Sequence, residues 1–261
     1  MGNEKKNATS SDALLARIQG NSSQTLDFVG WIFDGLIIHD NSNIVEFCCG
    51  TGKQTLEFVK RYAPSSNIYA FDIEQSSIDH LESQIEESLK KNTTCRCLDF
   101  NNFKKVKENL PESIDVFFCS YGLYYNNHAL EFLTLIKSRL TENGQIIIVG
   151  PYGKNNGELY DLLNECDVTI DEHILYTSQR FMIEIIDWMT DHFKDMEIKT
   201  ERNFIAWDSA DKVFSYWKNS TFYNADLQDT VKKRLDKHFK LHTEFINSKF
   251  IMKAKAKTFL P

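Results

Sequence analysis

One segment constrains the fold more than any other: an apolar run that leads into a loop of small residues. Residues 44–49 are Ile-Val-Glu-Phe-Cys-Cys, and Gly50, Thr51 and Gly52 follow. A carboxylate, Asp72, stands twenty positions after Gly52, at the end of a second apolar run. In a βαβ unit, a glycine loop between a strand and a helix approaches a nucleotide, and a late carboxylate can accept hydrogen bonds from ribose hydroxyls. The segment therefore predicts a nucleotide-binding α/β domain.

The rest of the first 150 residues alternates apolar, strand-like runs with segments of helical periodicity. Strands are expected over 43–48, 67–73, 93–98, 114–120 and 145–150, and the longest helix of this region is expected over 76–90. Such alternation is typical of a doubly wound parallel sheet. After residue 150 the alternation breaks down. Two long strands, 196–206 and 245–256, are expected there with helices between them, and we expect the pair to form an antiparallel ribbon.

The composition argues against some partners. The 261 residues can form one large α/β domain with a small helical insertion. The formal net charge of −7 argues against nucleic acid, because proteins that bind a duplex normally carry a basic stripe. The longest basic cluster, Lys253, Lys255 and Lys257, has the period of one strand face, and we expect that face to be solvated.

The sequence also bears on compartment and metal binding. It contains no run of about eighteen apolar residues, so we expect no membrane span. The polar N-terminus lacks a secretory signal and the six cysteines form no CxxC pair, so we expect a reducing, cytoplasmic environment. His238 and His242 stand four positions apart without a third ligand in the sequence, so we expect no metal site.

The spacing of small residues indicates which nucleotide is bound. A dinucleotide fingerprint requires glycine at 50, 52 and 55, and position 55 is Thr. The pattern from Glu46 to Gly52, acid-x-small-x-Gly-x-Gly, resembles the first motif of class I S-adenosylmethionine-dependent methyltransferases. Two further acids, Asp72 before Ile73 and Asp99 before Phe100, match the same family. The resemblance covers roughly residues 43 to 260.

This resemblance implies a fold and a domain organisation. The fold would be a doubly wound, seven-stranded, mostly parallel sheet with one antiparallel strand, the Rossmann-like methyltransferase fold, and a helical insertion before the last strand. Residues 1–40 would be an N-terminal helical cap that closes over the cofactor as a lid, and packing of this cap on the sheet edge is the alternative. Residues 41–261 would be the methyltransferase domain, in which 207–244 form the substrate-side insertion.

The resemblance also implies roles for the residues of the first two strand ends. Glu46 would anchor the loop and face the methionine amino end, while Gly50 and Gly52 would pass under the ligand. Asp72 would bind the ribose hydroxyls and Ile73 would pack on the adenine face. The family's first loop glycine is here Cys48. We expect Cys48 to line the cofactor site in an ordinary extended conformation, because a Cβ disfavours φ > 0.

Further cofactor contacts would come from the next two strand ends. Asp99 would accept a hydrogen bond from the exocyclic amine of adenine, with Phe100 beside the ring. Ser120 and Tyr121, at the end of the fourth strand, would lie near the methionine portion and the sulfonium. The cofactor would be S-adenosylmethionine and the product S-adenosylhomocysteine.

The acceptor side is less determined. Tyr124, Tyr125 and His128 are candidates for positioning or deprotonating the acceptor, and the catalytic residue stays open. Four aromatic side chains are expected to contact the substrate, namely Trp31, Tyr124, Trp217 and Tyr223. The aromatic and hydroxyl residues around Trp217 are similar to the insertion of methyltransferases of the trans-aconitate type, which act on small carboxylic acids.

These observations predict an S-adenosylmethionine-dependent enzyme that methylates an oxygen or a nitrogen of a small molecule. A non-catalytic protein of methyltransferase-like fold that binds a nucleoside remains an alternative, since methyl transfer needs no invariant catalytic side chain. A nicotinamide-dependent oxidoreductase is disfavoured by Thr55 and by the acid at position 46. The acceptor, the oligomeric state and the pathway stay open.

Overall fold

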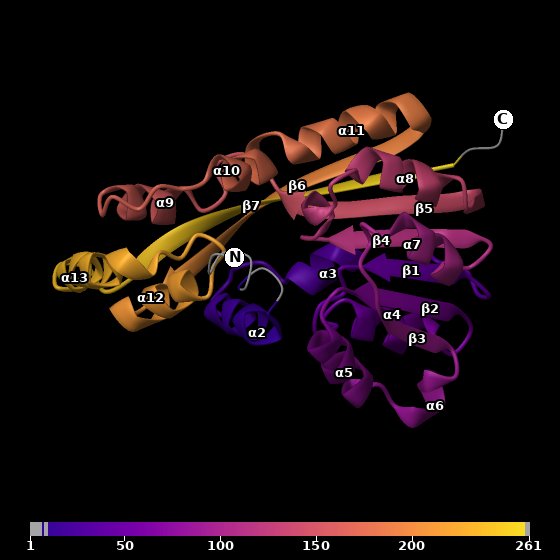
Figure 1. Ribbon diagram of the computed structural model, residues 1–261, viewed down its shortest axis with the longest axis horizontal. Helices are drawn as coiled ribbons and strands as arrows, with labels where there is room; N and C mark the ends of the chain where they lie inside the picture. The colour runs from indigo at the N-terminus through magenta and orange to yellow at the C-terminus, as the bar shows by residue number, and fades with distance from the viewer. Residues whose placement is uncertain (1–6, 8–9, 259–261) are drawn as a thin grey trace. The chain divides into compact units, whose positions relative to one another are not determined.

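A computed structural model describes residue 7 and residues 10–258 of the chain (Figure 1). The described residues form a seven-stranded sheet of order β3-β2-β1-β4-β5-β7-β6. The strands are β1 Asn43–Phe47, β2 Asn67–Asp72, β3 Thr93–Cys97, β4 Ile114–Ser120, β5 Leu140–Pro151, β6 Asp195–Trp207 and β7 Phe245–Lys257. The sheet is mostly parallel with one antiparallel pair, so the expected Rossmann-like methyltransferase fold is confirmed.

Helices connect these strands in the order that the sequence predicts for a βαβ protein. The α-helices are α2 Ser11–Gly20, α3 Phe28–Phe33, α4 Thr55–Tyr62, α5 Gln75–Gln84, α6 Glu87–Lys90, α7 Phe103–Asn109, α8 Ala129–Lys137, α9 Gly157–Asn164, α10 Glu172–Gln179, α11 Phe181–His192, α12 Ala210–Lys218 and α13 Gln228–Phe239. Two short 3-10 helices are η1 Leu123–Tyr125 and η2 Ala225–Leu227. The single helix expected over 76–90 is wrong, because Ile85 is extended and separates α5 from α6.

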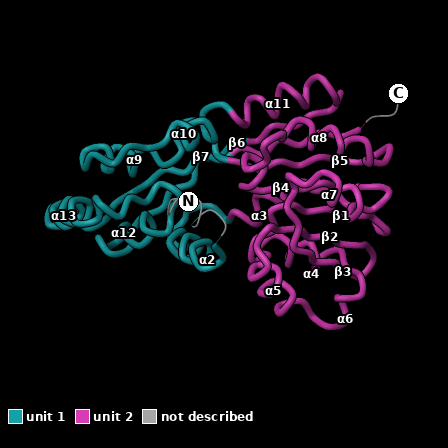
Figure 2. Tube along the Cα trace, viewed as in Figure 1, with its two compact units in different colours: residues 1–27, 151–180, 200–251 teal, residues 28–150, 181–199, 252–261 magenta. Residues whose placement is uncertain are grey.

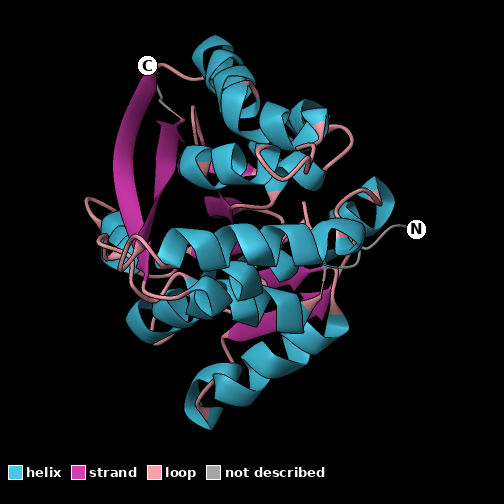
Figure 3. Cartoon of the chain, turned by 90° about the vertical axis from the view of Figure 1, so that its left-hand side faces the viewer, coloured by secondary structure: helices cyan, strands magenta, loops and turns pink. Residues whose placement is uncertain are grey.

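The chain divides into two compact units (Figure 2). Unit 1 comprises residues 1–27, 151–180 and 200–251, and unit 2 comprises residues 28–150, 181–199 and 252–261. The strands β6 and β7 are each 13 residues long and contribute residues to both units. In Figure 3, β7 is the long strand that leads to the C-terminus. These units do not follow the boundaries expected from the sequence, which remain a prediction.

Unit 2 contains the parallel strands. Ile44 of β1 pairs with Ile68 of β2 on one side and with Val116 of β4 on the other, and all three are fully buried or nearly so. Strands buried on both faces are apolar along their whole length, as in parallel sheets covered by helices. The strand order reverses between β1 and β4, which are neighbours in the sheet but not in the sequence. Ligands of open α/β sheets bind at the carboxyl ends of strands at such a switch point.

Unit 1 has its own apolar core. The core gathers side chains of the helices α9, α12 and α13 and of the strands β6 and β7, and it includes the buried side chains of Trp207 and Trp217. The unit also buries Lys249 of β7, whose ammonium donates a hydrogen bond of 2.5 Å to the hydroxyl of Tyr216 and another to Oδ1 of Asn156. Burial lowers the pKa of Lys249 to about 7.

Among the described residues, no helix is both long and apolar enough to cross a membrane.

Candidate functional site

The loop between β1 and α4 has a backbone that only small residues can supply. Gly50 and Gly52 have φ angles of +52° and +90°, in the region that glycine adopts without strain. A Cβ atom on Gly52 would lie 2.3 Å from Cδ1 of Leu81 in α5. The backbone N–H of Gly52 donates to the carbonyl of Cys49 at 3.0 Å, which closes the turn. Glycine at position 52 is therefore required twice, by the backbone angle and by the contact with α5.

The expectation of an extended Cys48 is wrong, because its φ is +60°. Two contacts fix the backbone conformation at Cys48. The N–H of the next residue, Cys49, donates to the carbonyl of Phe71 in β2 at 3.1 Å, and the backbone of Gly122 packs directly against Cys48. A Cβ atom on Gly122 would lie only 2.2 Å from Cβ of Cys48. The loop therefore imposes the left-handed conformation at this position although the residue there has a side chain.

Glu46 is a buried carboxyl group at the base of the loop. It is 1% exposed, and its Oε2 accepts a hydrogen bond of 2.7 Å from the hydroxyl of Thr55, the first residue of α4. Desolvation raises the pKa of Glu46 to about 8, opposed in part by the Thr55 hydrogen bond. Glu46 thus ties the strand before the loop to the helix after it. Its contact with the methionine end of a cofactor stays a prediction.

Asp72 lies against the glycine loop. Its Oδ2 accepts a hydrogen bond of 2.7 Å from the N–H of Gly50, and its Oδ1 accepts one of 3.0 Å from the N–H of Glu74. Burial raises the pKa of Asp72, and the two backbone hydrogen bonds oppose that shift. The structure therefore brings together the two elements that the sequence pairs, the loop after β1 and the acid at the end of β2.

Ile73, the next residue, is 49% exposed although its side chain is large and apolar. It follows directly on Asp72 at the carboxyl end of β2, where the sequence analysis expects the adenine face. An apolar side chain left in water at this edge of the sheet would gain about 25 cal/mol per Å² of surface on contact with a flat apolar ring. The position fits the expected role.

The end of β3 presents one of the two expected residues to solvent. Asp99 is exposed, and its Oδ1 accepts hydrogen bonds from the backbone and the side chain of Asn101 at 2.8 and 3.2 Å. Phe100 is buried, and its ring centroid lies 6.3 Å from that of Phe47 and 5.7 Å from that of Phe132. The ring of Phe100 is thus part of the aromatic core of unit 2, and its place beside adenine stays a prediction.

Two asparagines that the sequence analysis did not select join the loops after β3 and β4. The side chain of Asn126 donates to the carbonyl of Phe100 at 3.1 Å. The side-chain oxygen of Asn101 accepts from the backbone N–H of Asn127 at 2.8 Å. The sequence signal was an asparagine pair in the loop that follows each of these strands, a composition typical of turns.

The end of β4 also has an unusual backbone. Ser120 is half-buried, and Tyr121 follows it with φ of +54°. The N–H of Tyr121 donates to the carbonyl of Val149 in β5 at 2.8 Å, and its ring meets the ring of Phe28 edge to face at 5.9 Å. The next residue, Gly122, is the one that packs on Cys48. The loops after β1 and β4 are therefore in direct contact, and Gly122 is a site residue that sequence reasoning missed.

The three candidates for acceptor chemistry lie on the segment that leads into α8. Tyr124 is half-buried and Tyr125 is 42% exposed, with ring centroids 4.7 Å apart. The side chain of His128 is largely exposed, and its Nδ1 lies 3.7 Å from a carboxylate oxygen of Glu131. All three are accessible from solvent. Their role in positioning or deprotonating an acceptor stays a prediction.

The four expected substrate contacts belong to different units. Trp31 and Tyr124 are half-buried residues of unit 2. Trp217 and Tyr223 belong to unit 1, where Trp217 is fully buried and its indole N–H donates to the carbonyl of Phe222 at 3.1 Å. Tyr223 packs against Trp217 with ring centroids 4.9 Å apart. Trp217 is therefore a core residue whose polar group is already satisfied, and its contact with a substrate stays a prediction.

The carboxyl ends of β1, β2 and β4 thus offer a defined set of groups. They supply a loop without side chains at Gly50 and Gly52, a carboxylate at Asp72 and an exposed apolar surface at Ile73. This set can hold a ligand that carries vicinal hydroxyls and a flat ring. In the part of the chain that the structure describes, no three His, Cys, Asp or Glu side chains gather as a metal site would need.

Comparison with protein families yields one match. The model of a family described as Methyltransferase domain matches residues 38–198, which is more than half of the chain. The matched region includes the loop after β1, Asp72 and the ends of β3 and β4. No curated protein sequence matches the chain.

Solved structures share the fold at low sequence identity. The protein BH2331 of Bacillus halodurans C-125 is 10% identical, with a TM-score of 0.59 over 90% of this chain and 100% of that one. The [4+2]-cyclase SpnF is 11% identical, with a TM-score of 0.52 over 89% and 81%. The plantazolicin methyltransferase BpumL, solved with a triazolic desmethylPZN analogue and S-adenosylhomocysteine, is 14% identical, with a TM-score of 0.50 over 98% and 91%. At these identities the likeness establishes the fold, and the cyclase illustrates that one fold serves several chemistries.

Proposed function

Because this chain belongs to the methyltransferase domain family, we propose that it transfers the methyl group of S-adenosylmethionine to an oxygen or nitrogen of a small molecule. The observation that carries the proposal is the hydrogen bond between Gly50 N–H and the carboxylate of Asp72, which joins the nucleotide loop to the ribose acid. The binding of S-adenosylhomocysteine by BpumL, which has the same fold, supports this choice of cofactor.

The residues at this edge of the sheet fit such a cofactor. The carboxylate of Asp72 can accept hydrogen bonds from two ribose hydroxyls, and Ile73 offers an exposed apolar surface to the adenine ring. The left-handed backbone at Gly50 and Gly52 lets the main chain approach the ligand without a Cβ atom between them. Asp99, exposed at the end of β3, can accept from the exocyclic amine. Ser120 and Tyr121, at the end of β4, would lie near the methionine portion of the cofactor.

When bound, the cofactor supplies an electrophilic methyl group on a sulfonium. The residues of the chain have to align the acceptor with that methyl group, and alignment alone can contribute ~7–11 kcal/mol to such a reaction. A general base is needed only where the acceptor must lose a proton. Tyr124, Tyr125 and His128 are the candidates for that step, because they are accessible and lie on the segment between β4 and α8.

We propose a small molecule as the acceptor rather than a nucleic acid. The formal charge of −7 disfavours a polyanionic partner, since affinity for nucleic acid depends largely on cationic side chains that neutralise phosphates. Trp31 and Tyr124 are half-buried aromatic side chains of unit 2 that could contact such an acceptor. The six free cysteines agree with a reducing compartment such as the cytoplasm.

A methyl-transfer assay tests the proposal. The purified protein is incubated with S-adenosylmethionine labelled in the methyl group and with a panel of small carboxylic acids, amines and phenols. We expect label in one chemical class of product, and no transfer with the Asp72→Ala variant. Transfer to no compound, together with tight binding of S-adenosylhomocysteine, would support the non-catalytic alternative. A thermal shift with NAD and none with S-adenosylhomocysteine would support an oxidoreductase.

A further inference from the structure

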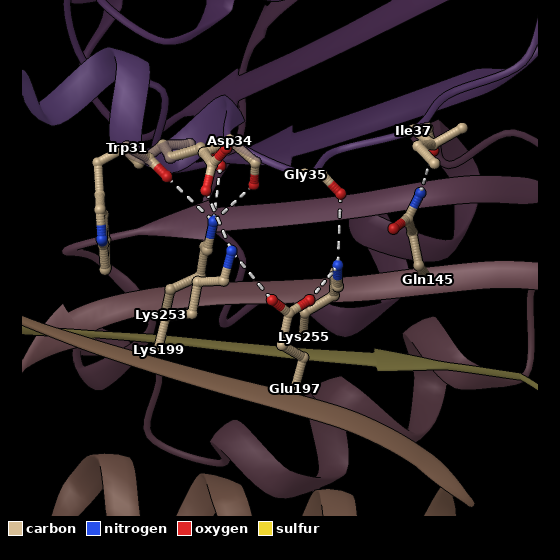
Figure 4. A network of polar contacts seen from close by, with 10 residues as sticks. Trp31, Asp34, Gly35, Ile37, Gln145, Glu197, Lys199, Lys253 and Lys255 are labelled. Carbon is tan, nitrogen blue, oxygen red and sulfur yellow. Dashed lines mark hydrogen bonds and ion pairs between the residues drawn. The ribbon is translucent and has the colours of Figure 1, made fainter.

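The lysine face of β7 is not solvated as the sequence predicted. Lys253 is 3% exposed, and its ammonium points at the end of α3 (Figure 4). Its Nζ donates hydrogen bonds to three backbone carbonyls, those of Trp31 at 3.0 Å, Ile32 at 3.1 Å and Asp34 at 3.2 Å. All of these residues belong to unit 2. The strand β7 therefore contacts the end of α3, a helix that lies more than 200 residues earlier in the sequence.

The carbonyl groups explain why a lysine is found there. The last turn of a helix leaves carbonyls without partners inside the helix, and α3 has only six residues. An ammonium group has three N–H donors and no acceptor, so Lys253 can satisfy three carbonyls at once. Its positive charge also opposes the partial negative charge at a helix C-terminus. Loss of this group would remove the Lys253 donor from all three carbonyls.

Neighbouring ion pairs strengthen the same attachment. Lys199 of β6 lies 3.1 Å from the carboxylate of Asp34, and Lys255 donates to the carbonyl of Gly35 at 3.5 Å. Glu197 pairs with both of these lysines. Figure 4 shows these side chains of β6 and β7 directed at the segment that ends α3. We call residues 31–35 together with Lys199, Lys253 and Lys255 the lysine clamp.

The opposite end of α3 contacts the candidate cofactor site. The ring of Phe28, the first residue of α3, meets Tyr121 edge to face at 5.9 Å. Tyr121 precedes Gly122, whose backbone packs on Cys48 in the glycine loop. The ammonium of Lys253 also lies 5.2 Å from the centroid of the Trp31 ring, within range of a cation–π contact. A continuous series of contacts therefore joins the clamp to the loop after β1.

We propose that Lys253 is a positioning residue for the methyl-donor site: by fixing the end of α3, it holds Phe28 against Tyr121 and so supports the loop that receives the cofactor. This inference rests on the proposed function, since it assumes that the cofactor binds at this loop. It also gives α3 a definite role. The helix is a fixed wall of the site, attached at one end by three lysines, and not a lid that swings freely.

The test compares variants by their dissociation constant for S-adenosylhomocysteine, measured by calorimetry. Lys253→Met removes the three N–H donors and keeps most of the side-chain volume. Lys253→Arg keeps the charge but replaces the compact ammonium by a planar fork. Lys257→Met is the matched control, because Lys257 lies on the same face of β7 beyond the clamp. Phe28→Leu leaves the lysine in place and removes only the ring that meets Tyr121.

The proposal predicts a dissociation constant at least tenfold higher for Lys253→Met and for Phe28→Leu, a smaller increase for Lys253→Arg, and a value within twofold of the wild type for Lys257→Met. A spectroscopic readout accompanies the binding data. In protein labelled with 5-fluorotryptophan, the Trp31 resonance, assigned with Trp31→Phe, should move toward the position of the free amino acid in Lys253→Met and stay unchanged in Lys257→Met.

Binding within twofold of the wild type by a folded Lys253→Met protein would overturn the proposal, even if its melting temperature falls, because the lysine would then serve stability alone. Should that variant not fold, unchanged binding by Phe28→Leu would overturn it instead. A wild-type protein that does not bind S-adenosylhomocysteine would overturn both this proposal and the proposed function. If the wild type binds S-adenosylhomocysteine and the Lys253→Met and Phe28→Leu variants bind it equally well, only the proposal about Lys253 would be overturned.

Discussion

The N–H of Gly50 donates a hydrogen bond of 2.7 Å to Oδ2 of Asp72. This contact joins the loop after β1 to the end of β2, and these two strands are parallel neighbours. It fixes the position of the carboxylate relative to the loop. A site that is already arranged loses less conformational entropy when a ligand binds.

The first prediction concerns this carboxylate. Asp72→Ala should weaken the binding of S-adenosylhomocysteine by at least about tenfold, because hydrogen bonds to a charged group contribute about 1.5–3 kcal/mol each. Calorimetry of the variant measures the loss. Asp79→Ala is the control, since Asp79 is an exposed carboxylate on α5 in the same unit. Equal affinities of Asp72→Ala and the wild type would remove Asp72 from the binding site.

The second prediction concerns the glycine loop. Gly52→Ala should lower the free energy of unfolding of unit 2 by about 2–5 kcal/mol, from left-handed strain and overpacking together. The overpacking arises because the new Cβ would lie 2.3 Å from Cδ1 of Leu81. Gly35→Ala serves as the comparison, since Gly35 also has a positive φ but the nearest atom would be a flexible lysine nitrogen at 3.8 Å. Denaturant titration of both variants should give the smaller loss for Gly35→Ala, and equal losses would argue against the Leu81 contact.

The third prediction concerns Cys48 and Gly122 as a pair. Gly122→Ala should destabilise unit 2, because its Cβ would lie 2.2 Å from Cβ of Cys48. In a Cys48→Gly background the same substitution should destabilise unit 2 less, because the Cβ atom at position 48 that would clash is absent. Glycine also adopts the positive φ at this position without strain. A double-mutant cycle measured by denaturant unfolding gives the coupling. Additive effects of the two changes would contradict the contact.

The fourth prediction concerns the pH dependence of stability at Glu46. Its pKa in the folded protein is about 8, above the ordinary value of 4.5, so the native state binds the proton more tightly than the unfolded state. The stabilising contribution of the protonated form is complete below about pH 4.5 and is lost as the pH rises through about 8. In the Glu46→Gln variant the side-chain amide does not titrate, so the variant should not lose stability from this position as the pH rises.

The measurement is the difference in melting temperature between Glu46→Gln and the wild type at pH 5.5 and at pH 8.5. Because all other titrating groups are shared, their effects cancel in the difference. The melting temperature of Glu46→Gln should rise relative to that of the wild type between pH 5.5 and pH 8.5. A difference that does not change with pH would show that Glu46 titrates normally, and its burial would then need another explanation.

Local patterns in the sequence predicted the parallel core and the loop. A run such as Ile44 to Phe47 can be recognised as a buried strand because every residue but one is apolar, and the glycines after it indicate a turn. The sequence predicted that Asp72 ends the second strand, because its distance along the chain from Gly52 is set by one helix and one strand. These features depend on residues close to one another in the sequence.

Features that depend on distant residues could not be predicted in this way. The left-handed Cys48 results from contact with Gly122, which lies in another loop. The burial of Phe100 depends on Phe132 of α8. Lys253 has the spacing of a solvated strand face, and only the position of α3 makes it a buried donor. In each case the partner is more than thirty residues away along the chain, where spacing carries no information.

Calorimetric titration of the wild-type protein with S-adenosylhomocysteine tests the central claim most directly. We predict one binding site per chain, competition by S-adenosylmethionine and no competition by NAD. Absence of binding at millimolar ligand, or displacement of the bound ligand by NAD, would contradict the claim that the loop after β1 and the carboxylate of Asp72 form a site for an adenosyl sulfonium.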